Sequence, residues 1–152
     1  MVALDVDGTL LNPGTQTISE PVRNAVRAVV DAGAHVVVST GRSMLGTTPI
    51  LEDLGVTSGT ALCSNGAVTM DVATSTPVAV ETFDPAPVYR ALAERLPGAA
   101  FATEELGTGN LVTEPFSPRS LHGPQRLVSL DELLGEPVPR MIASWVGRHP
   151  DA

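Results

Sequence analysis

Two apolar segments, residues 1–6 and 35–39, flank a single helical pattern, and this arrangement constrains the fold more than any other feature. Between them, Ser19 suits the N-cap of a helix and Gly33 suits its end. The apolar residues of this interval recur at helical spacing: Val22, Ala25, Val26, Val29 and Val30. A strand, a helix and a strand in this order form a βαβ unit, with parallel strands and a right-handed crossover. The sequence therefore predicts an α/β fold built on a Rossmann-like parallel sheet.

Polar residues follow three of the predicted strands. Asp5-Val6-Asp7-Gly8-Thr9 ends the first segment, and Thr40-Gly41-Arg42 follows the second. Ser64-Asn65-Gly66 follows a third apolar segment at residues 60–63. Because parallel strands have their carboxyl ends at the same edge of a sheet, we expect these three segments to meet there. Open α/β sheets bind their ligands at that edge, so it is the predicted functional site.

The first strand end, taken alone, allows two interpretations. Asp5 and Asp7, with Gly8 and Thr9, could form an ordinary Asx-turn. Asp5, however, lies in an otherwise apolar segment, where a buried carboxylate is costly unless it is paired or bound to a cation. Mg²⁺ takes one or two carboxylates together with phosphate oxygens. One carboxylate could then attack phosphorus and the other could handle the leaving-group proton, while N–H groups beside Gly8 face the phosphate.

The other two strand ends have groups that bind phosphate. Thr40 supplies a hydroxyl, Gly41 a flexible backbone and Arg42 a guanidinium, and a helix predicted at residues 43–54 begins beside them with its positive end. The alternative is an N-cap threonine followed by a surface arginine. Ser64-Asn65-Gly66 alone is an ordinary turn. It supports a functional site only because it is expected at the same sheet edge as the other two segments.

The charge balance narrows the class of partner. The chain of 152 residues has a formal net charge of −8, and its nine basic residues are all arginine. Nucleic-acid binding depends on clustered cations, so a nucleic-acid partner is not expected. The single cysteine, Cys63, excludes an intramolecular disulfide. There is no basic signal-peptide region and no apolar run long enough to span a bilayer, so a soluble cytoplasmic protein without a membrane partner is expected.

The pattern changes after about residue 80. Asp84-Pro85 suits the start of a helix, and Ser129-Leu130-Asp131-Glu132 forms a capping box. Apolar segments that predict strands lie at residues 99–103, 110–113 and 141–146. Glu104, Glu105 and Asn110 are expected in a loop. A solvated turn is the favoured interpretation, and a loop that faces the active site and helps to choose the substrate is the alternative. Helices and strands mixed at this spacing predict a small α+β unit.

Three segments of the chain resemble a known family. Residues 2–12 (VALDVDGTLLN), 36–42 (VVVSTGR) and 64–67 (SNGA), in this order and at this spacing, resemble the haloacid dehalogenase superfamily. They look most like its Cof-type branch of sugar-phosphate and related phosphatases. The resemblance implies that residues 1–80 form the N-terminal part of the core. It also implies that residues 81–152 begin an α/β cap domain, which is incomplete here.

The resemblance implies a role for each residue at the three strand ends. Asp5 would be the nucleophile that becomes an aspartyl-phosphate, and Asp7 the general acid and base. Mg²⁺ would be held by the carboxylate of Asp5 and the backbone carbonyl of Asp7. Thr40 would hydrogen-bond the transferring phosphoryl group. The remaining phosphate- or substrate-contacting positions would be Gly8, Thr9, Gly41, Arg42, Asn65 and Gly66. The implied activity is Mg²⁺-dependent hydrolysis of a small phosphorylated metabolite.

The chain also departs from the family's pattern. It has no lysine, and its downstream acidic residues, such as Asp84 and Asp131, lack the Gly-Asp motif that completes the metal site in the family. Residues 149–152 resemble the beginning of a helix. We therefore expect residues 1–152 to be the N-terminal part of a longer protein. Both missing groups stabilise the transferring phosphoryl group, so these residues alone are expected to be a poor catalyst.

Three other functions stay open. A phosphomutase of the same superfamily would differ only in the acceptor of the phosphoryl group. A truncated, non-catalytic remnant would bind phosphate or metal weakly, or pack against a partner. A phospho-acceptor regulatory domain also places an aspartate at a parallel strand end. The Thr40-Gly41-Arg42 and Ser64-Asn65-Gly66 segments and the second half of the chain argue against that last function.

Overall fold

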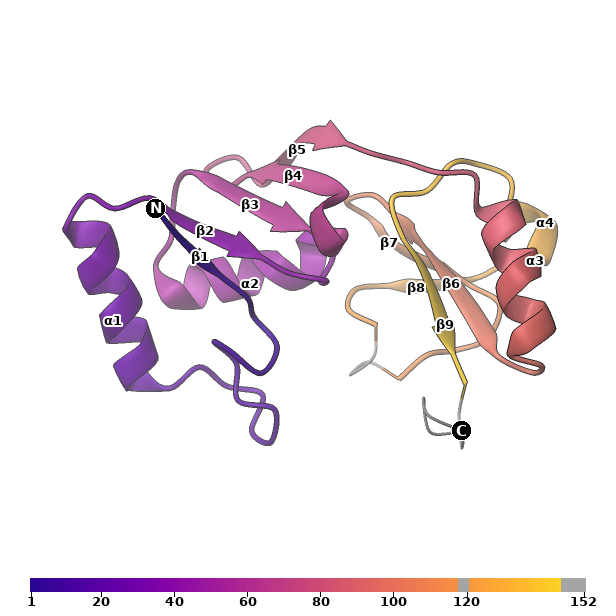
Figure 1. Cartoon of the computed structure of the whole chain (residues 1–152), viewed down its shortest axis with the longest axis horizontal. Helices are drawn as coiled ribbons and strands as arrows, with labels where there is room; N and C mark the ends of the chain where they lie inside the picture. Colours follow the sequence, from indigo (N-terminus) through magenta and orange to yellow (C-terminus); the bar gives the residue numbers. More distant parts are fainter. Residues whose placement is uncertain (118–120, 146–152) are drawn as a thin grey trace. The chain divides into compact units, whose positions relative to one another are not determined.

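The computed structural model describes residues 1–117 and 121–145 (Figure 1). Backbone contacts divide the chain into two compact units, Met1–Glu81 and Thr82–Ala152. The first contains a five-stranded sheet and the second a four-stranded sheet, each accompanied by helices. This architecture confirms the predicted α/β fold. Within the described residues, no helix has the length and apolar character needed to cross a membrane.

The sheet of the first unit begins with three parallel strands. In sheet order its strands are β1 (Val2–Leu4), β2 (Val36–Ser39), β3 (Thr60–Cys63), β4 (Val68–Asp71) and β5 (Thr76–Val80). Ala3 pairs with Val37 and Val38 pairs with Ala61, both in parallel register, whereas β4 and β5 run antiparallel. The carboxyl ends of β1, β2 and β3 therefore lie at one edge, as the βαβ unit predicts.

Two helices, α1 (Glu20–Asp31) and α2 (Met44–Leu54), connect these strands. Both crossovers run in the same direction along the sheet, so right-handed connections place both helices on the same face. An ion pair of Arg23 with Asp53, at 2.9 Å, joins the two helices on that face. The sheet and helices bury a core of aliphatic side chains that includes Val6, Val38, Leu54, Ala61 and Met70.

Strand β1 stands at the end of the strand order and has a neighbour on one side only. Val2 in this strand is 37% exposed. The apolar stripe of α1 is also only partly covered, because Val26 is 6% exposed whereas Val30 is 37% exposed. The residues around β1 are therefore less buried than a central parallel strand would be.

The hairpin of β4 and β5 is closed by an aspartate turn. The Oδ1 atom of Asp71 accepts hydrogen bonds from the backbone N–H of Thr74 at 2.9 Å and from its hydroxyl at 2.8 Å. These bonds, the backbone one first, hold the pKa of Asp71 below its ordinary value. The turn fixes the register in which Asp71 pairs with Thr76.

The second unit packs two helices with a mixed sheet (Figure 1). Its elements are α3 (Pro85–Arg95), β6 (Ala100–Glu105), β7 (Gly109–Val112), β8 (Gln125–Leu127), α4 (Leu130–Leu133) and β9 (Met141–Ser144). The sheet order is β8-β7-β6-β9, in which only the β7–β8 pair is parallel. Asp84 and Ser129 cap α3 and α4 as predicted. Strand β8 was not predicted, and residues 146 and 149–152 lie outside the described residues.

Glu104 and Asn110 do not lie in a solvated loop, and that prediction is wrong. They are directly opposite one another on β6 and β7, and they are 4% and 2% exposed. Glu104 forms an ion pair with Arg140 at 3.2 Å, and the side-chain amide of Asn110 donates to the carbonyl of His122 at 2.9 Å. These polar partners make the burial of both side chains tolerable, which the sequence pattern does not reveal.

Replacing Gly109 by alanine is expected to destabilise the second unit by about 2–4 kcal/mol. Gly109 has a φ of 154°, and a Cβ atom there would lie 2.5 Å from the backbone oxygen of Pro124. That oxygen also accepts a hydrogen bond from the N–H of Asn110 at 2.9 Å, so it cannot move away without weakening this bond. Urea-induced unfolding would measure the change.

Gly107→Ala is the matched control. Gly107 also has a positive φ, 74°, but a Cβ atom there would have no atom of the described residues within 4 Å. We expect a loss of about 1 kcal/mol, from the backbone conformation alone. Equal losses in the two variants would contradict the close approach of β7 to Pro124.

Candidate active site

The segments that follow β2 and β3 are joined by backbone hydrogen bonds. The N–H of Thr40 donates to Leu62 at 2.9 Å, that of Asn65 to Thr40 at 3.0 Å, and that of Ser64 to Arg42 at 2.8 Å. Each bond connects one strand end to the other. Thr40-Gly41-Arg42 and Ser64-Asn65-Gly66 therefore lie side by side at the carboxyl edge of the sheet, as parallel pairing predicts.

The segment after β1 is a tight loop built around the carbonyl of Val6. Val6 is fully buried, and its carbonyl accepts the N–H groups of Thr9, Leu10 and Leu11 at 3.3, 3.0 and 2.8 Å. The N–H of Gly8 donates to Leu11 at 3.1 Å, and Gly8 adopts a φ of 83° that glycine accommodates without strain. In this conformation the N–H groups of Gly8 and Thr9 bond within the loop rather than facing a ligand.

Asp5 is exposed, so the predicted cost of a buried carboxylate does not arise here. Strand β1 ends at Leu4, so Asp5 lies just beyond the strand rather than within it. The carboxylate of Asp5 is therefore open to solvent and to a ligand at the carboxyl edge.

Asp7 and Arg42 form a two-pronged ion pair between the first and second strand ends. The Nη2 atom of Arg42 lies 2.6 Å from Oδ1 of Asp7, and its Nε atom lies 2.8 Å from Oδ2. Arg42 is 8% exposed, whereas the side chain of Asp7 is 55% exposed. The sequence pattern assigns this guanidinium to phosphate, and the structure places it against the second aspartate instead.

The sequence gives only a coarse signal for this pair. Asp7 and Arg42 have opposite charges and follow two neighbouring parallel strands, β1 and β2. Leu4 pairs with Val38, so the two residues are not in register, and their contact depends on the loops after the strands.

The third strand end has an unusual backbone. Ser64 and Asn65 have φ values of 53° and 59°, and Gly66 has one of 91°. Positive φ at two successive non-glycine residues is costly and recurs at functional sites. The turn brings the Asn65 side chain against the backbone of Gly41, where a Cβ atom would lie 2.9 Å from Asn65 Oδ1. Sequence patterns identify the turn but not this close approach.

Thr40 is 4% exposed, and its hydroxyl oxygen accepts the N–H of Arg42 at 3.2 Å. A hydroxyl that accepts one bond can still donate its proton to another group. Behind it, the hydroxyl of Ser43 caps α2 by accepting the N–H of Gly46 at 3.3 Å. Thr40 is therefore a fixed donor at the start of a well-capped helix.

The oxygen donors at this edge suit a hard cation such as Mg²⁺. They are the carboxylate of Asp5 and the backbone carbonyl of Asp7, since Arg42 engages the Asp7 carboxylate. Among residues 1–117 and 121–145, no group of three or more acidic, histidine or cysteine side chains could hold a metal ion. The described residues thus fit Mg²⁺ as two of its ligands, with the other positions left to water or to a phosphate.

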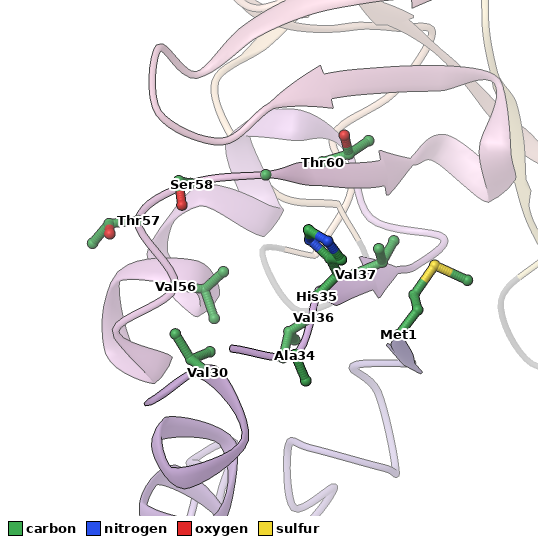
Figure 2. A pocket seen from close by; sticks show the side chains of 11 residues that line it. Met1, Val30, Ala34, His35, Val36, Val37, Val56, Thr57, Ser58 and Thr60 are labelled. Atoms are coloured by element: carbon green, nitrogen blue, oxygen red, sulfur yellow. The ribbon is translucent and has the colours of Figure 1, made fainter. Parts of the chain in front are cut away.

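A pocket of about 340 Å³ lies at the opposite end of these strands (Figure 2). Its lining comes from the segments that lead into β2 and β3, including His35, Val36, Val56 and Thr60, together with Val30 of α1. Ligands of open α/β sheets bind outside the carboxyl ends of the strands. This pocket is at the amino ends, so it is not the candidate active site.

Comparison with known proteins identifies a family. Residues 2–95 match the family model described as haloacid dehalogenase-like hydrolase. The chain is 43% identical over 58 residues to the 5-amino-6-(5-phospho-D-ribitylamino)uracil phosphatase YcsE of Bacillus subtilis. It is 34% identical over 92 residues to the pyridoxal phosphate phosphatase YbhA of Escherichia coli. A solved phosphatase of the same superfamily from Bacteroides thetaiotaomicron matches with a TM-score of 0.63 and 25% identity.

The chain spans only part of each of these proteins. The alignments cover 38% and 60% of this chain but 23% and 32% of the Bacillus and Escherichia proteins. The structural match covers 88% of this chain and 50% of the Bacteroides phosphatase. Both units of the chain therefore have counterparts in about half of a larger fold.

Gly41→Ala is expected to displace the Asn65 side chain at a cost of less than about 1 kcal/mol, because the obstructing atom is the end of a side chain that can rotate. The Asn65 side-chain amide signals in a ¹H–¹⁵N spectrum should shift while the unfolding midpoint changes little. In an Asn65→Gly background, which removes the obstacle, Gly41→Ala should have no further effect on the midpoint. A loss above about 2 kcal/mol would contradict the freedom of Asn65 to move.

Proposed function

This chain belongs to the haloacid dehalogenase-like hydrolase family, in its Cof-type branch, and we propose that its first unit carries the nucleophile and the acid/base of a Mg²⁺-dependent phosphatase. The observation that carries the proposal is the arrangement at one sheet edge. Asp5 and Asp7 follow β1, and the hydrogen-bonded segments of Thr40 and Asn65 follow β2 and β3. The proposed substrate is a phosphomonoester of a small metabolite.

Asp5 is the proposed nucleophile because the resemblance to the family gives that role to the first aspartate, and its exposure at the ligand-binding edge is compatible with it. A carboxylate oxygen of Asp5 attacks phosphorus, and the bond from phosphorus to the ester oxygen breaks. Asp7 gives the leaving oxygen a proton. Water then attacks the phosphorus of the aspartyl-phosphate and passes a proton to Asp7, which restores both carboxyl groups and releases phosphate.

The donors for the transferring phosphoryl group come from the second and third strand ends. The Thr40 hydroxyl retains a proton to donate, and the exposed backbone of Gly41 and Gly66 with the Asn65 amide lies beside it. Gly8 and Thr9 border this surface from the first strand end, but their N–H groups bond within their own loop and are not among the proposed donors. Fixed donors aimed at developing charge contribute most to phosphoryl transfer.

Mg²⁺ is the proposed cofactor, held by the carboxylate of Asp5 and the backbone carbonyl of Asp7. When bound, it supplies positive charge beside the phosphoryl oxygens. The residues of this chain orient the nucleophile and donate hydrogen bonds to the phosphoryl group. The formal charge of −8 makes local positive charge necessary for any phosphate site on this surface.

Two relatives suggest the class of substrate. The Bacillus protein is a phosphatase of a phospho-ribitylamino-uracil, and the Escherichia protein is a phosphatase of pyridoxal phosphate. Both names describe a small phosphorylated metabolite, and we propose a substrate of that class for this chain. A non-catalytic role is the second candidate. That candidate concerns residues 1–152 alone, whose described part offers Mg²⁺ the two ligands named above.

In the complete protein, Asp5→Asn is expected to abolish phosphate release, because an amide cannot attack phosphorus. Release from a panel of sugar and cofactor phosphates would be followed with Mg²⁺ present. Intact-mass measurement after acid quenching would detect the phosphorylated chain during turnover and miss it in the variant. Asp31→Asn, an exposed aspartate at the end of α1, is the control and should keep full activity. Turnover by Asp5→Asn at the wild-type rate would exclude Asp5 as the nucleophile.

Removal of the metal is expected to lower phosphate release by at least about 100-fold, since the charge of Mg²⁺ would no longer offset that of the phosphoryl group. The assay compares chelator-treated protein with the same sample after Mg²⁺ is restored. Recovery on addition supports the phosphatase. Absence of release and of phosphorylated chain under both conditions would favour the non-catalytic role.

A further inference from the structure

We propose that Arg42 is a positioning residue that fixes the carboxylate of Asp7, rather than a ligand of the substrate phosphate. The inference rests on the proposed function, in which Asp7 exchanges a proton with the leaving oxygen and with water. It assigns to Arg42 a role in the proton-transfer step. It also removes Arg42 from the set of phosphate-binding groups that the sequence pattern predicts.

The contact has the geometry of a fixed pair. Two different nitrogen atoms of Arg42, Nε and Nη2, donate to two different oxygen atoms of Asp7 at 2.8 and 2.6 Å. Such a side-on arrangement sets both the position and the plane of the carboxylate. A carboxylate held in this way has lost the rotational freedom that an exposed aspartate has.

Burial shows which partner is the anchor. Arg42 is 8% exposed and its Nη1 atom points to the carbonyl of Gly46, at 3.5 Å, in the first turn of α2. The carbonyl of Arg42 also accepts the N–H of Ser64. Asp7, by contrast, has a side chain that is 55% exposed. The guanidinium is thus held by the protein, and the aspartate presents its exposed side to the ligand edge.

The same contact argues against a role in phosphate binding. To reach a phosphate, Arg42 would have to give up two charge-assisted hydrogen bonds and leave Asp7 without this contact. Removing a largely buried guanidinium from its partner is costly. A phosphate at this edge has the Thr40 hydroxyl and the exposed side-chain amide of Asn65 as donors that need no such rearrangement.

A second pair in the same unit shows what an ordinary structural contact looks like. Arg23 and Asp53 join α1 and α2, with one nitrogen, Nη1, at 2.9 Å from both carboxylate oxygens. Their side chains are 31% and 44% exposed, and neither follows a strand at the carboxyl edge. Like Arg42 and Asp7, this is an Arg–Asp pair in the first unit, but it lies away from the carboxyl edge of the sheet.

The consequence for the reaction is specific. Proton transfer needs the carboxyl oxygen aligned with the leaving oxygen, and misplacement by about 1 Å can cost about 100-fold in rate. During formation of the aspartyl-phosphate, that cost applies only where the leaving group needs a proton, whereas the later attack of water is the same for every ester. Loss of Arg42 should therefore lower kcat/KM, which reports that first step, more for alkyl phosphates, whose leaving groups are strongly basic, than for nitrophenyl phosphate. Substrate binding should change little.

The first test compares Arg42→Met with wild type on glycerol phosphate and on p-nitrophenyl phosphate. We expect kcat/KM to fall about 10- to 100-fold on the alkyl ester and less than about 3-fold on the nitrophenyl ester, with the inhibition constant of inorganic phosphate within about 2-fold of wild type. In an Asp7→Asn background, Arg42→Met should cause no further loss. Arg23→Met is the matched control and should leave both reactions unchanged. A rise in KM of about 10-fold on both esters, or losses that multiply in the double variant, would assign Arg42 to phosphate and overturn the inference.

The second test needs no activity and no metal. Thermal unfolding of the 152-residue chain is measured for wild type, Arg42→Met, Asp7→Asn and the double variant. A coupled pair predicts that the melting temperature of the double variant lies about 5 °C or more above the value expected from adding the two single losses. Additive losses would overturn the positioning inference whatever the activity. Lack of phosphate release from wild type, by contrast, would count against the proposed function. The four melting temperatures would still show whether Arg42 and Asp7 are coupled.

Discussion

Parallel pairing of β1, β2 and β3 is the constraint on which the rest of the first unit depends. Ala3 pairs with Val37 and Val38 with Ala61, so one edge receives the carboxyl ends of all three strands. This pairing brings the segment after β1 to residues that are distant in the sequence, as the contact of Asp7 with Arg42 shows. Right-handed crossovers then place α1 and α2 on one face, which leaves the edge open. The chemistry of the edge is a consequence of strand direction.

The edge is held together mainly by backbone groups. Bonds from Thr40 to Leu62, from Asn65 to Thr40 and from Ser64 to Arg42 link the second and third strand ends. The loop after β1 instead satisfies its N–H groups within itself, on the carbonyl of Val6. The side chains at the edge are therefore attached to a backbone whose N–H and carbonyl groups named above already have hydrogen-bond partners. Such a framework can orient ligand-binding groups without using them for folding.

Much of the fold could be predicted from the sequence, because its signals are local. The βαβ unit follows from two β-branched segments and one amphipathic helix, and the caps Asp84 and Ser129 follow from residue types at helix starts. Strand β8 was missed because Gln125–Leu127 is short and has no apolar alternation. The burial of Glu104 and Asn110 depends on cross-strand partners that are distant in sequence. Long-range pairing is the information that single-sequence patterns lack.

The candidate site, too, could be predicted from the sequence only in part. The convergence of the three strand ends could be predicted from strand direction alone. The exposure of Asp5 could not, because Asp5 follows the end of β1 rather than lying within it, and residue types alone do not fix where a strand ends. The positive φ values of Ser64 and Asn65 accompany packing against Gly41, which a turn motif does not specify. The roles of individual residues in catalysis stay predictions that the variants above address.

The distribution of positive charge at this edge follows from these contacts. In the proposed phosphatase, a substrate phosphate and two aspartates would bring several negative charges together on residues whose formal charge is −8. Arg42 is a cation at the same edge, but both of its hydrogen bonds to a carboxylate go to Asp7. If Arg42 stays on Asp7, it cannot also neutralise the phosphate. Within these residues, the charge of Asp5 and of a bound phosphate would then be balanced by the proposed cation and by neutral donors such as the Thr40 hydroxyl.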